Sequence, residues 1–456
     1  MNKKLVALAV AGALSPALTM ADDSTVTLYG KLSLGVESVK AEGCTTNAAG
    51  ACTGPTNLAT GSSAGQNIPS RIRVTDNASY LGFRGNEPLG GGTSAIFQIE
   101  SYIKVDSQPG RSTAYNTTTF ANRDSGVGLR GPFGEIQVGN FRTYFANHIP
   151  SGDTLFLKSS LAASVSALFG ASSTMGGQAT ALVGLTPAGG FAPANAEGRG
   201  AVDAGGFRNN VLRYTSPNWG GFTAGFNYVA PEGTVTIPTN TAASNAGKAS
   251  DKGVEVRLTY LNPNLGFANY SYYKRNDYLV GTALGSVGGS IGNDSKNQKI
   301  AVGTKLVGIT VGIVAEKIQH TNPDLIATPQ NDSVDREVKK YALFLAYETG
   351  PWAFGTSYAK AKAVDDNTGR NCTDPSPFPS QALTSCSGTG ARFYQATVLY
   401  NLSKRSNLYA TFARIKNDST AAYDFYTQAA VGDSGPSFIA RGSSPQVLAV
   451  GLTHYF

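Results

Sequence analysis

The feature of this chain that most restricts its fold is the alternation of apolar and polar residues with a period of two. From Val26 to Val36, Val and Leu alternate with Thr, Tyr, Lys and Ser, and the pattern recurs in 94–105, 254–260 and 299–306. Successive side chains of a β-strand point to opposite faces. The chain is therefore predicted to form strands with one apolar and one polar face.

Seven short turns and eight long connections separate these strands, which predicts sixteen strands. The short turns are rich in Gly, Pro and Asn and lie at 87–92, 131–134, 216–221, 261–266, 307–308, 349–352 and 401–406. The long polar connections lie near 40–71, 107–119, 143–206, 231–250, 277–296, 321–336, 364–391 and 418–444. Short turns at one end and long loops at the other are typical of a transmembrane antiparallel β-barrel of the outer membrane.

A barrel satisfies the backbone because a closed sheet leaves no unpaired edge in lipid. Its apolar faces point to lipid and its polar faces line the lumen. Charged residues make up 15% of the chain, against about 25% in ordinary soluble domains. The alternative is a soluble β-sandwich that packs the apolar faces together. The asymmetric loops and the N-terminal segment favour the barrel.

The strongest apolar run is at the N-terminus, where Lys3 and Lys4 precede 5–14 and Pro16 follows. This arrangement is typical of a secretory signal peptide, with cleavage expected after Ala21. The sequence thus predicts a signal peptide at 1–21 and one barrel at 22–456, exported to the bacterial outer membrane.

Four cysteines form two close pairs, Cys44 with Cys52 and Cys372 with Cys386. Each pair lies within a polar loop, and an exported chain meets an oxidising compartment. We expect two local disulfides. Free thiols or a metal site are the alternatives, but no His accompanies either pair, and we expect neither a metal nor a cofactor.

Several motifs together resemble the Gram-negative general-diffusion porin family, in particular its neisserial, β-proteobacterial branch. They are VTLYG (26–30), LGFRGNEPLGGGTSAIFQIE (81–100), NRDSGVGLRGPFG (122–134), QVG (137–139), NNVLRYTSPNWGGF (209–222), NLSKR (401–405) and VGLTHYF (450–456). The resemblance implies a homotrimer of sixteen-stranded barrels in outer-membrane lipid and lipopolysaccharide. Each barrel would be a water-filled pore for ions and small hydrophilic solutes, narrowed by an infolded third loop. A C-terminal aromatic, Phe456, resembles the signal that the outer-membrane assembly machinery reads.

The third long connection, 143–206, is the longest and is uncharged over 161–196. A barrel of about sixteen strands is too wide for side chains to fill. A solvated loop should be more polar than this one, so we expect the loop to fold inward. An ordinary external loop is the alternative.

Charged side chains at the narrowest point should set ion selectivity. The residues expected to line the channel or its constriction are Lys31, Tyr80, Arg84, Glu100, Arg123, Asp124, Arg130, Asp153, Arg208, Arg213 and Arg257. Strict alternation points Asp124 inward and Arg123 outward, and one residue of register decides which way Arg208 points. Arg84, Arg130 and Arg213 lie close to turns and are expected to form a basic funnel at the periplasmic end. Tyr80 stands where relatives often carry an arginine. We expect a modest preference for anions.

Two other functions are possible for such a barrel. An outer-membrane hydrolase would need a His at the rim, and His148 and His320 lie near loops, whereas His454 faces lipid. No nucleophile elbow or acid pair accompanies them, so no catalytic residue is expected. A surface adhesin or receptor that binds through its long loops is the main alternative to a passive pore.

Overall fold

A computed structural model describes most of the strands and parts of the loops. It describes residues 25–46, 50–57, 62–64, 67–103, 105–106, 120–145, 158–169, 207–230, 235–236, 248–249, 252–280, 290–322, 334–366, 387–419, 421, 423–425, 431 and 439–456. The expected signal peptide, 1–21, lies outside these residues.

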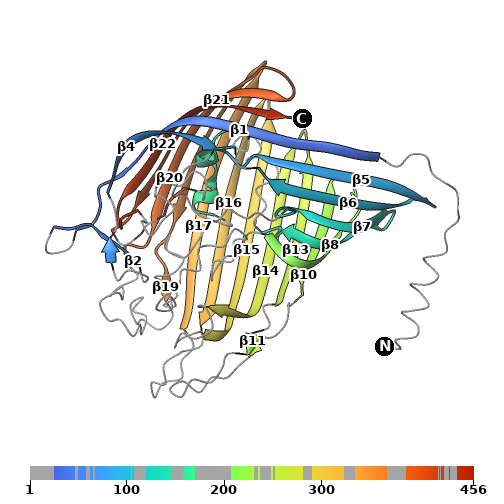
Figure 1. Ribbon diagram of the computed structural model, residues 1–456, viewed down its shortest axis with the longest axis horizontal. Coiled ribbons are helices and arrows are strands. Elements are labelled where there is room, and N and C mark those ends of the chain that lie inside the picture. Colours follow the sequence, from blue (N-terminus) through green and yellow to red (C-terminus); the bar gives the residue numbers. More distant parts are fainter. Residues whose placement is uncertain are drawn as a thin grey trace.

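The molecule is built on one antiparallel sheet that closes on itself (Figure 1). Its strands are β1 (Thr25–Glu42), β4 (Ile68–Asp76), β5 (Tyr80–Gly90), β6 (Thr93–Tyr102), β7 (Ser125–Gly131), β8 (Gly134–Arg142), β9 (Phe207–Thr215), β10 (Phe222–Val229), β13 (Lys252–Asn262), β14 (Gly266–Val280), β15 (Ser290–Leu306), β16 (Ile309–Asn322), β17 (Val334–Thr349), β18 (Trp352–Ala361), β19 (Asp365–Asp366), β20 (Ala391–Asn401), β21 (Ser406–Asn417) and β22 (Ser444–Tyr455). Apart from β4 with β5 and β18 with β19, strands that follow one another in this sheet pair with each other, and β22 pairs with β1 to close the ring.

The 18 strands of this sheet make sixteen wall strands. Both β4 and β5 pair with β1 and form one wall strand that is interrupted at 77–79. In the same way, β19 continues β18 along β17. The prediction of a sixteen-stranded antiparallel barrel is therefore confirmed.

Side chains alternate between an exposed outer face and a covered inner face. In β18, Trp352, Phe354 and Tyr358 are exposed, whereas Ala353 and Ser357 are buried. The exposed positions of the other strands are also mostly apolar, as expected for a surface in contact with lipid. The buried positions face the interior of the barrel.

The wall strands differ in length around the barrel. β7 has 7 residues and β8 has 9, whereas β15 has 17 and β17 has 16. At about 3.3 Å per residue, β7 extends ~23 Å, and tilt reduces its height below the ~25 Å of the apolar band. β9 has 9 residues and β10 has 8, so the wall is low from β7 to β10.

The predicted short turns lie at one end of the barrel, where glycines permit tight reversals. Gly134 has φ +101, and a Cβ there would lie 2.3 Å from the Thr215 carbonyl oxygen.

Small elements lie in the connections: strands β2 (Thr53–Asn57), β3 (Ser62–Ala64), β11 (Val235–Thr236) and β12 (Lys248–Ala249), and 3-10 helices η2 (Leu161–Ala163) and η3 (Val165–Ala167). None of the helices in the described ranges is long and apolar enough to cross a membrane.

Candidate functional site

Part of the third long connection, 158–169, contacts the inner face of the wall through hydrogen bonds. The Ser160 hydroxyl donates to Glu37 Oε1 at 3.0 Å, and the Leu161 backbone N–H donates to Asn77 Oδ1 at 2.8 Å. The Lys158 carbonyl accepts from Asn407 Nδ2 at 2.8 Å and from Thr453 Oγ1 at 3.1 Å. These partners belong to β1, β21, β22 and the interruption between β4 and β5.

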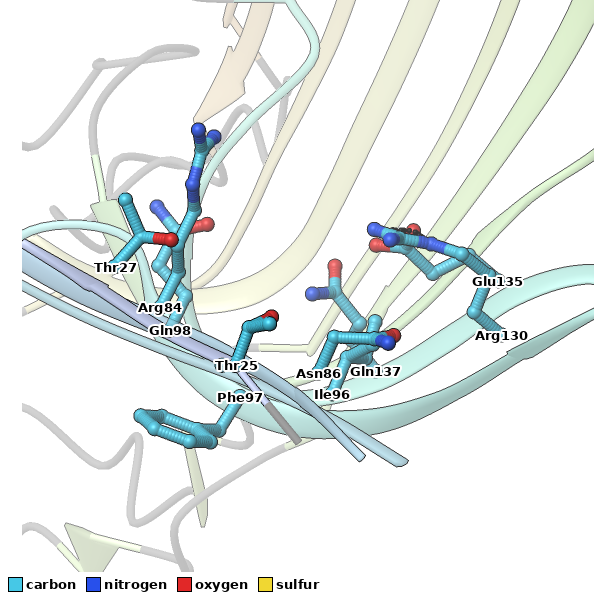
Figure 2. A pocket seen from close by; sticks show the side chains of 11 residues that line it. Thr25, Thr27, Arg84, Asn86, Ile96, Phe97, Gln98, Arg130, Glu135 and Gln137 are labelled. Atoms are coloured by element: carbon cyan, nitrogen blue, oxygen red, sulfur yellow. Dashed lines mark hydrogen bonds and ion pairs between the residues drawn. The ribbon is translucent and has the colours of Figure 1, made fainter. Parts of the chain in front are cut away.

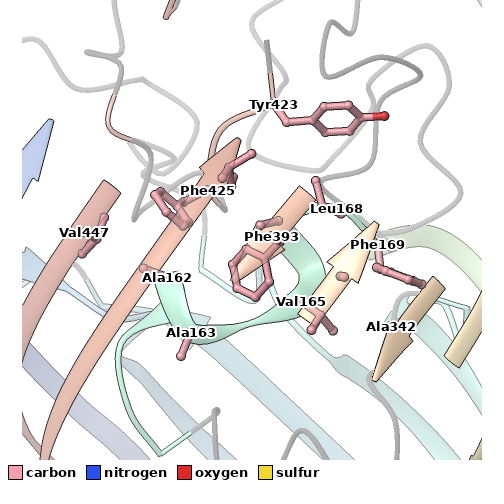
Figure 3. Packing of buried hydrophobic residues seen from close by; sticks show 14 of the residues in the cluster. Ala162, Ala163, Val165, Leu168, Phe169, Ala342, Phe393, Tyr423, Phe425 and Val447 are labelled. Carbon is pink, nitrogen blue, oxygen red and sulfur yellow. The ribbon is translucent and has the colours of Figure 1, made fainter. Parts of the chain in front are cut away.

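Apolar contacts hold the same segment against β18, β20 and β21. Its buried side chains are Ala162, Ala163, Val165, Leu168 and Phe169, which belong to one cluster with Ala342, Phe393, Phe425 and Val447 (Figure 3). The inner wall there carries Ala at several positions, which leaves room for this segment.

The Glu37 carboxylate is the polar centre of this contact. It is fully buried and accepts from Arg73 Nε at 3.1 Å, Arg73 Nη2 at 3.0 Å and Thr75 Oγ1 at 3.0 Å. A buried carboxylate is stable only when it is paired and hydrogen-bonded. Ser160 supplies the remaining hydrogen bond, so Glu37 joins the segment to the wall.

The beginning of the same connection is held at a second place. Glu255 of β13 accepts the backbone N–H of Tyr144 at 2.8 Å and also that of Phe145, while Asn227 Nδ2 donates to it at 2.7 Å. The Lys299 ammonium donates to the Phe145 carbonyl and lies 4.6 Å from the centre of the Phe145 ring.

Lys299 is one end of a row of buried charges across three strands. Glu316 lies 3.6 Å from Lys299 and 3.5 Å from Lys340, and all three side chains are 5% exposed or less. The row fixes Lys299 where it meets Phe145.

Arg213 and Arg257 lie together around Tyr144 rather than with the other arginines. Their guanidinium carbons are 4.7 Å and 4.2 Å from the Tyr144 ring centre. Arg213 also donates to Asn227 Oδ1 at 3.1 Å. Arg213 is two residues from the end of β9 (Phe207–Thr215) at the short turn, and Tyr144 Oη reaches Thr215 Oγ1 at 2.9 Å, so the place of Arg213 in the basic funnel stays a prediction.

Arg123 points inward, so its predicted outward orientation is wrong. Its guanidinium bonds to Glu100 and lies between two inward rings, 4.6 Å from the centre of Tyr80 and 4.3 Å from that of Tyr102. Strict alternation fails because β7 begins only at 125, so Arg123 lies in a bend before it. Tyr29 Oη donates to Glu100 Oε2 at 3.1 Å and completes this group.

Two further predicted residues lie near this group. Lys31 is 6% exposed, and its ammonium donates to the Asn77 carbonyl at 2.7 Å. Asp124 Oδ1 accepts the backbone N–H of Arg142 at 2.7 Å, which ties the start of β7 to the end of β8.

Arg84 and Arg130 line a hollow of about 230 Å³ at the short-turn end of the barrel (Figure 2). Arg130 pairs with Glu135, with 2.7 Å between Arg130 Nη2 and Glu135 Oε2, and Arg84 lies 5.2 Å from the Tyr29 ring centre. Thr27 and Gln98 line the same hollow, whose walls are mostly polar.

Some predicted residues cannot be placed. Asp153, Cys372, Cys386 and His148 lie outside the described residues. Of Arg208 only the backbone is described, and it pairs with Phe141; His320 is likewise described by its backbone alone. The Cys44–Cys52 disulfide is present. His454 is on the outer face, with Nδ1 2.8 Å from Ser406 Oγ.

The inner wall also holds charged residues that were not among the predicted site residues: Glu37, Arg73, Glu255, Lys299, Glu316 and Lys340. Glu37 lies on the same face of β1 as Lys31, so the alternation of the sequence could have predicted that Glu37 points inward. Their loop contacts depend on the path of the third connection, which no local pattern reveals. Within the described ranges no cluster of three or more His, Cys, Asp or Glu residues is suited to hold a metal ion.

Comparison with known proteins agrees with this architecture. The chain is 32% identical over 232 residues to outer membrane porin protein 32 of Delftia acidovorans, which covers 51% of this chain and 50% of that protein. It is 32% identical over 154 residues to the major outer membrane protein P.IA of Neisseria meningitidis, covering 32% of this chain and 34% of that one. The chain thus matches half of the length of the first relative and a third of the second.

Solved structures share the fold. The anion-selective porin from Comamonas acidovorans superposes with a TM-score of 0.58 at 22% identity, covering 95% of this chain and 100% of that one. The outer-membrane OmpT of Vibrio cholerae gives 0.54 at 12% identity, covering 96% and 99%. The family model described as Gram-negative porin matches residues 7–420. The chain belongs to the Gram-negative porin family.

Proposed function

We propose that the protein is a passive diffusion channel for ions and small hydrophilic solutes across the outer membrane. The observation that carries the proposal is a closed sixteen-stranded barrel with an apolar outer face and charged groups on its inner face. A barrel of this strand number leaves an aqueous interior, and no chemistry is needed to move a solute through it.

The third long loop folds into the lumen and narrows it in this proposal. The support is the double attachment of its described parts, at 143–145 to β13 and β15 and at 158–169 to the opposite part of the wall. β17, β18 and β20 lie about eight wall strands from β7, β8 and β9, so the attached segment faces the wall with Arg123 across the lumen. In the sequence, Asp153 stands between the two attached segments.

A modest anion preference follows from the inward charges. The inward cations described above are Lys31, Arg73, Arg84, Arg123, Arg130, Arg213, Arg257, Lys299 and Lys340, and the inward carboxylates are Glu37, Glu100, Asp124, Glu135, Glu255 and Glu316. Most of these carboxylates are engaged by an arginine or by backbone N–H groups. The excess is positive, and the Comamonas porin of similar fold is anion-selective.

A homotrimer is the assembly we propose. The wall at β7 and β8 is too low to span the apolar band alone, while its outward side chains Val127, Leu129, Ile136 and Val138 are apolar. A neighbouring copy would cover them. OmpT of Vibrio cholerae, which has a similar fold, has been solved in a trimer form. Phe456 would be read by the assembly machinery before β22 closes on β1.

The porin family and the barrel fold support a channel rather than an enzyme. Hydrolysis would need a polar His at the rim with a nucleophile, and the described His454 instead lies on the outer face with Ser406. A surface receptor would need only the loops, so an obstructed lumen would favour it over the channel.

Conductance across a planar lipid bilayer under a KCl gradient tests the proposal. Purified protein should give stepwise current increases in groups of three and a reversal potential of the sign expected for chloride preference. Protein that inserts but passes no current would favour the surface receptor. A reversal potential of the opposite sign, which indicates cation preference, would still support a diffusion channel but would contradict the proposed anion preference.

A further inference from the structure

Four tyrosines gather on one part of the inner wall, between the hollow at the short-turn end and the interruption of the wall at 77–79. Tyr80 pairs with Tyr102 across β5 and β6, and Lys31 of β1 pairs with both Tyr80 and Tyr455, so these three tyrosines lie at one level. Tyr29 lies one level nearer the short turns, on the same face of β1 as Lys31. We call Tyr29, Tyr80, Tyr102 and Tyr455 the tyrosine patch.

The rings of the tyrosine patch are partly open to the lumen. All four side chains are half-buried. The ring centres of Tyr29 and Tyr80 are 6.3 Å apart, and the two ring planes are inclined at 66°. Tyr29 fits there because its partner on β5 is Gly82, and a Cβ at that position would collide with the ring. Since aromatic rings attract one another edge to face or offset, a third ring can pack in the angle between the two.

Holding Arg123 in place does not account for the whole tyrosine patch. Arg123 lies between the rings of Tyr80 and Tyr102. Tyr455 lies on the other side of Lys31, and Tyr29 faces a different cation, because the Arg84 guanidinium carbon is 5.2 Å from its ring centre. A role limited to Arg123 would need only two of the four rings.

Arg84 supplies a positive charge beside the tyrosine patch. It is exposed at the hollow of about 230 Å³, where Thr27 and Gln98 add polar groups (Figure 2). Glu135 lines the same hollow but pairs with Arg130, and Glu100 is engaged by Arg123 and Tyr29. Among the residues that the structure describes, no carboxylate lies at ion-pair distance from Arg84. Its charge is therefore available to a solute.

We propose that the tyrosine patch and Arg84 form a binding site for aromatic carboxylates, such as benzoate, that pass through the lumen. The aromatic ring packs against Tyr29 and Tyr80, and the carboxylate accepts hydrogen bonds from the Arg84 guanidinium. Two residues of a strand span about 7 Å, so Arg84 lies one small solute length from Gly82 and the ring above it. A guanidinium binds a carboxylate through two parallel N–H groups. This inference rests on the proposed diffusion channel and names a class of solute for it.

Block of the KCl current in planar bilayers by added anions tests the proposal. Benzoate and cyclohexanecarboxylate have the same charge and nearly the same size, but only benzoate has an aromatic ring. With the anion on both sides, benzoate should halve the current at a concentration about fivefold lower than cyclohexanecarboxylate does. Equal half-blocking concentrations would overturn this inference and leave the channel. Absence of any KCl current would contradict the channel, and this inference with it.

Two variants separate the ring contact from the charge contact. Tyr80→Leu should raise the half-blocking concentration of benzoate about fivefold and that of cyclohexanecarboxylate little. Tyr80→Phe keeps the ring and should restore the block by benzoate. Arg84→Gln should weaken the block by both anions, because it removes the contact that they share.

Tyr358→Leu is the matched control, since Tyr358 lies on the outer face of β18. Its benzoate block should equal that of the wild type. The KCl current of each variant shows that it has folded, and Tyr29→Leu replaces Tyr80→Leu if the latter does not fold. Equal weakening of both anions by Tyr80→Leu, or equal loss of benzoate block in Tyr80→Leu and Tyr358→Leu, would overturn the proposal.

Discussion

Arg123 and Glu100 show how one ion pair can limit the charge that a solute meets. The guanidinium is held between the Tyr80 and Tyr102 rings, and Glu100 offsets its charge. We predict that Glu100→Gln increases the chloride-to-potassium permeability ratio by about twofold, because a weakly screened cation then remains at the wall. The Gln amide can still accept from Tyr29 Oη. The reversal potential in a KCl gradient measures the change.

Glu135→Gln is the matched control, since Glu135 also pairs with an arginine. Arg130 is 57% exposed at the short-turn end of the barrel, where water and salt screen the charge. Its selectivity should stay close to that of the wild type. An equal shift of the reversal potential in both variants would contradict the prediction. It would show that the lumen is no narrower at Arg123 than at Arg130.

At the scale of single residues, alternation predicted the inward side of Lys31, Arg84 and Arg257 because they lie within regular strands. It failed at Arg123 because this residue lies in a bend before β7, where side chains no longer alternate strictly. The Arg123 side chain points inward, to Glu100 and the two tyrosine rings. It also could not place Tyr144 between Arg213 and Arg257, since that contact joins β8, β9 and β13 through a loop.

At the scale of elements, the start of the third loop depends on one anchoring lysine. We predict that Lys299→Met makes the open channel noisier and changes its conductance, because the Phe145 carbonyl loses a buried donor at a cost of about 1–3 kcal/mol. Lys340 still pairs with Glu316, so no carboxylate is left unpaired. Current recordings at constant voltage measure both quantities.

Lys305→Met, on the same strand, is the control for lost charge alone. Lys305 is exposed near the short turn. It should affect selectivity without adding noise. If the two variants behave alike, Lys299 acts only as a charge and does not position the loop.

The elements themselves were predictable where the strand rule is simple. Gly, Pro and Asn marked all seven short turns, and the strand number followed. The inner face was expected to be polar throughout. The structure differs at β15–β17, whose inner face carries the apolar residues Ala301, Val314 and Ala342. Sequence alone could not show this, because a period of two identifies the two faces of a strand but not what packs against them.

At the scale of the whole molecule, the short strands around β7 and β8 and the long strands around β15 and β17 divide the barrel into two sectors. If the low sector faces neighbouring copies, polar side chains there should weaken the trimer. We predict that V127N/L129N converts most of the protein to monomers in detergent, at a cost of about 1–3 kcal/mol for each buried amide without a partner. Size-exclusion chromatography with light scattering measures the mass.

L343N/L345N is the matched control, since Leu343 and Leu345 are 50% and 43% exposed on the long strand β17. Detergent and water can solvate those amides, so this variant should remain trimeric. Dissociation of the control alone would place the contact between copies on the side of the long strands, contrary to the prediction.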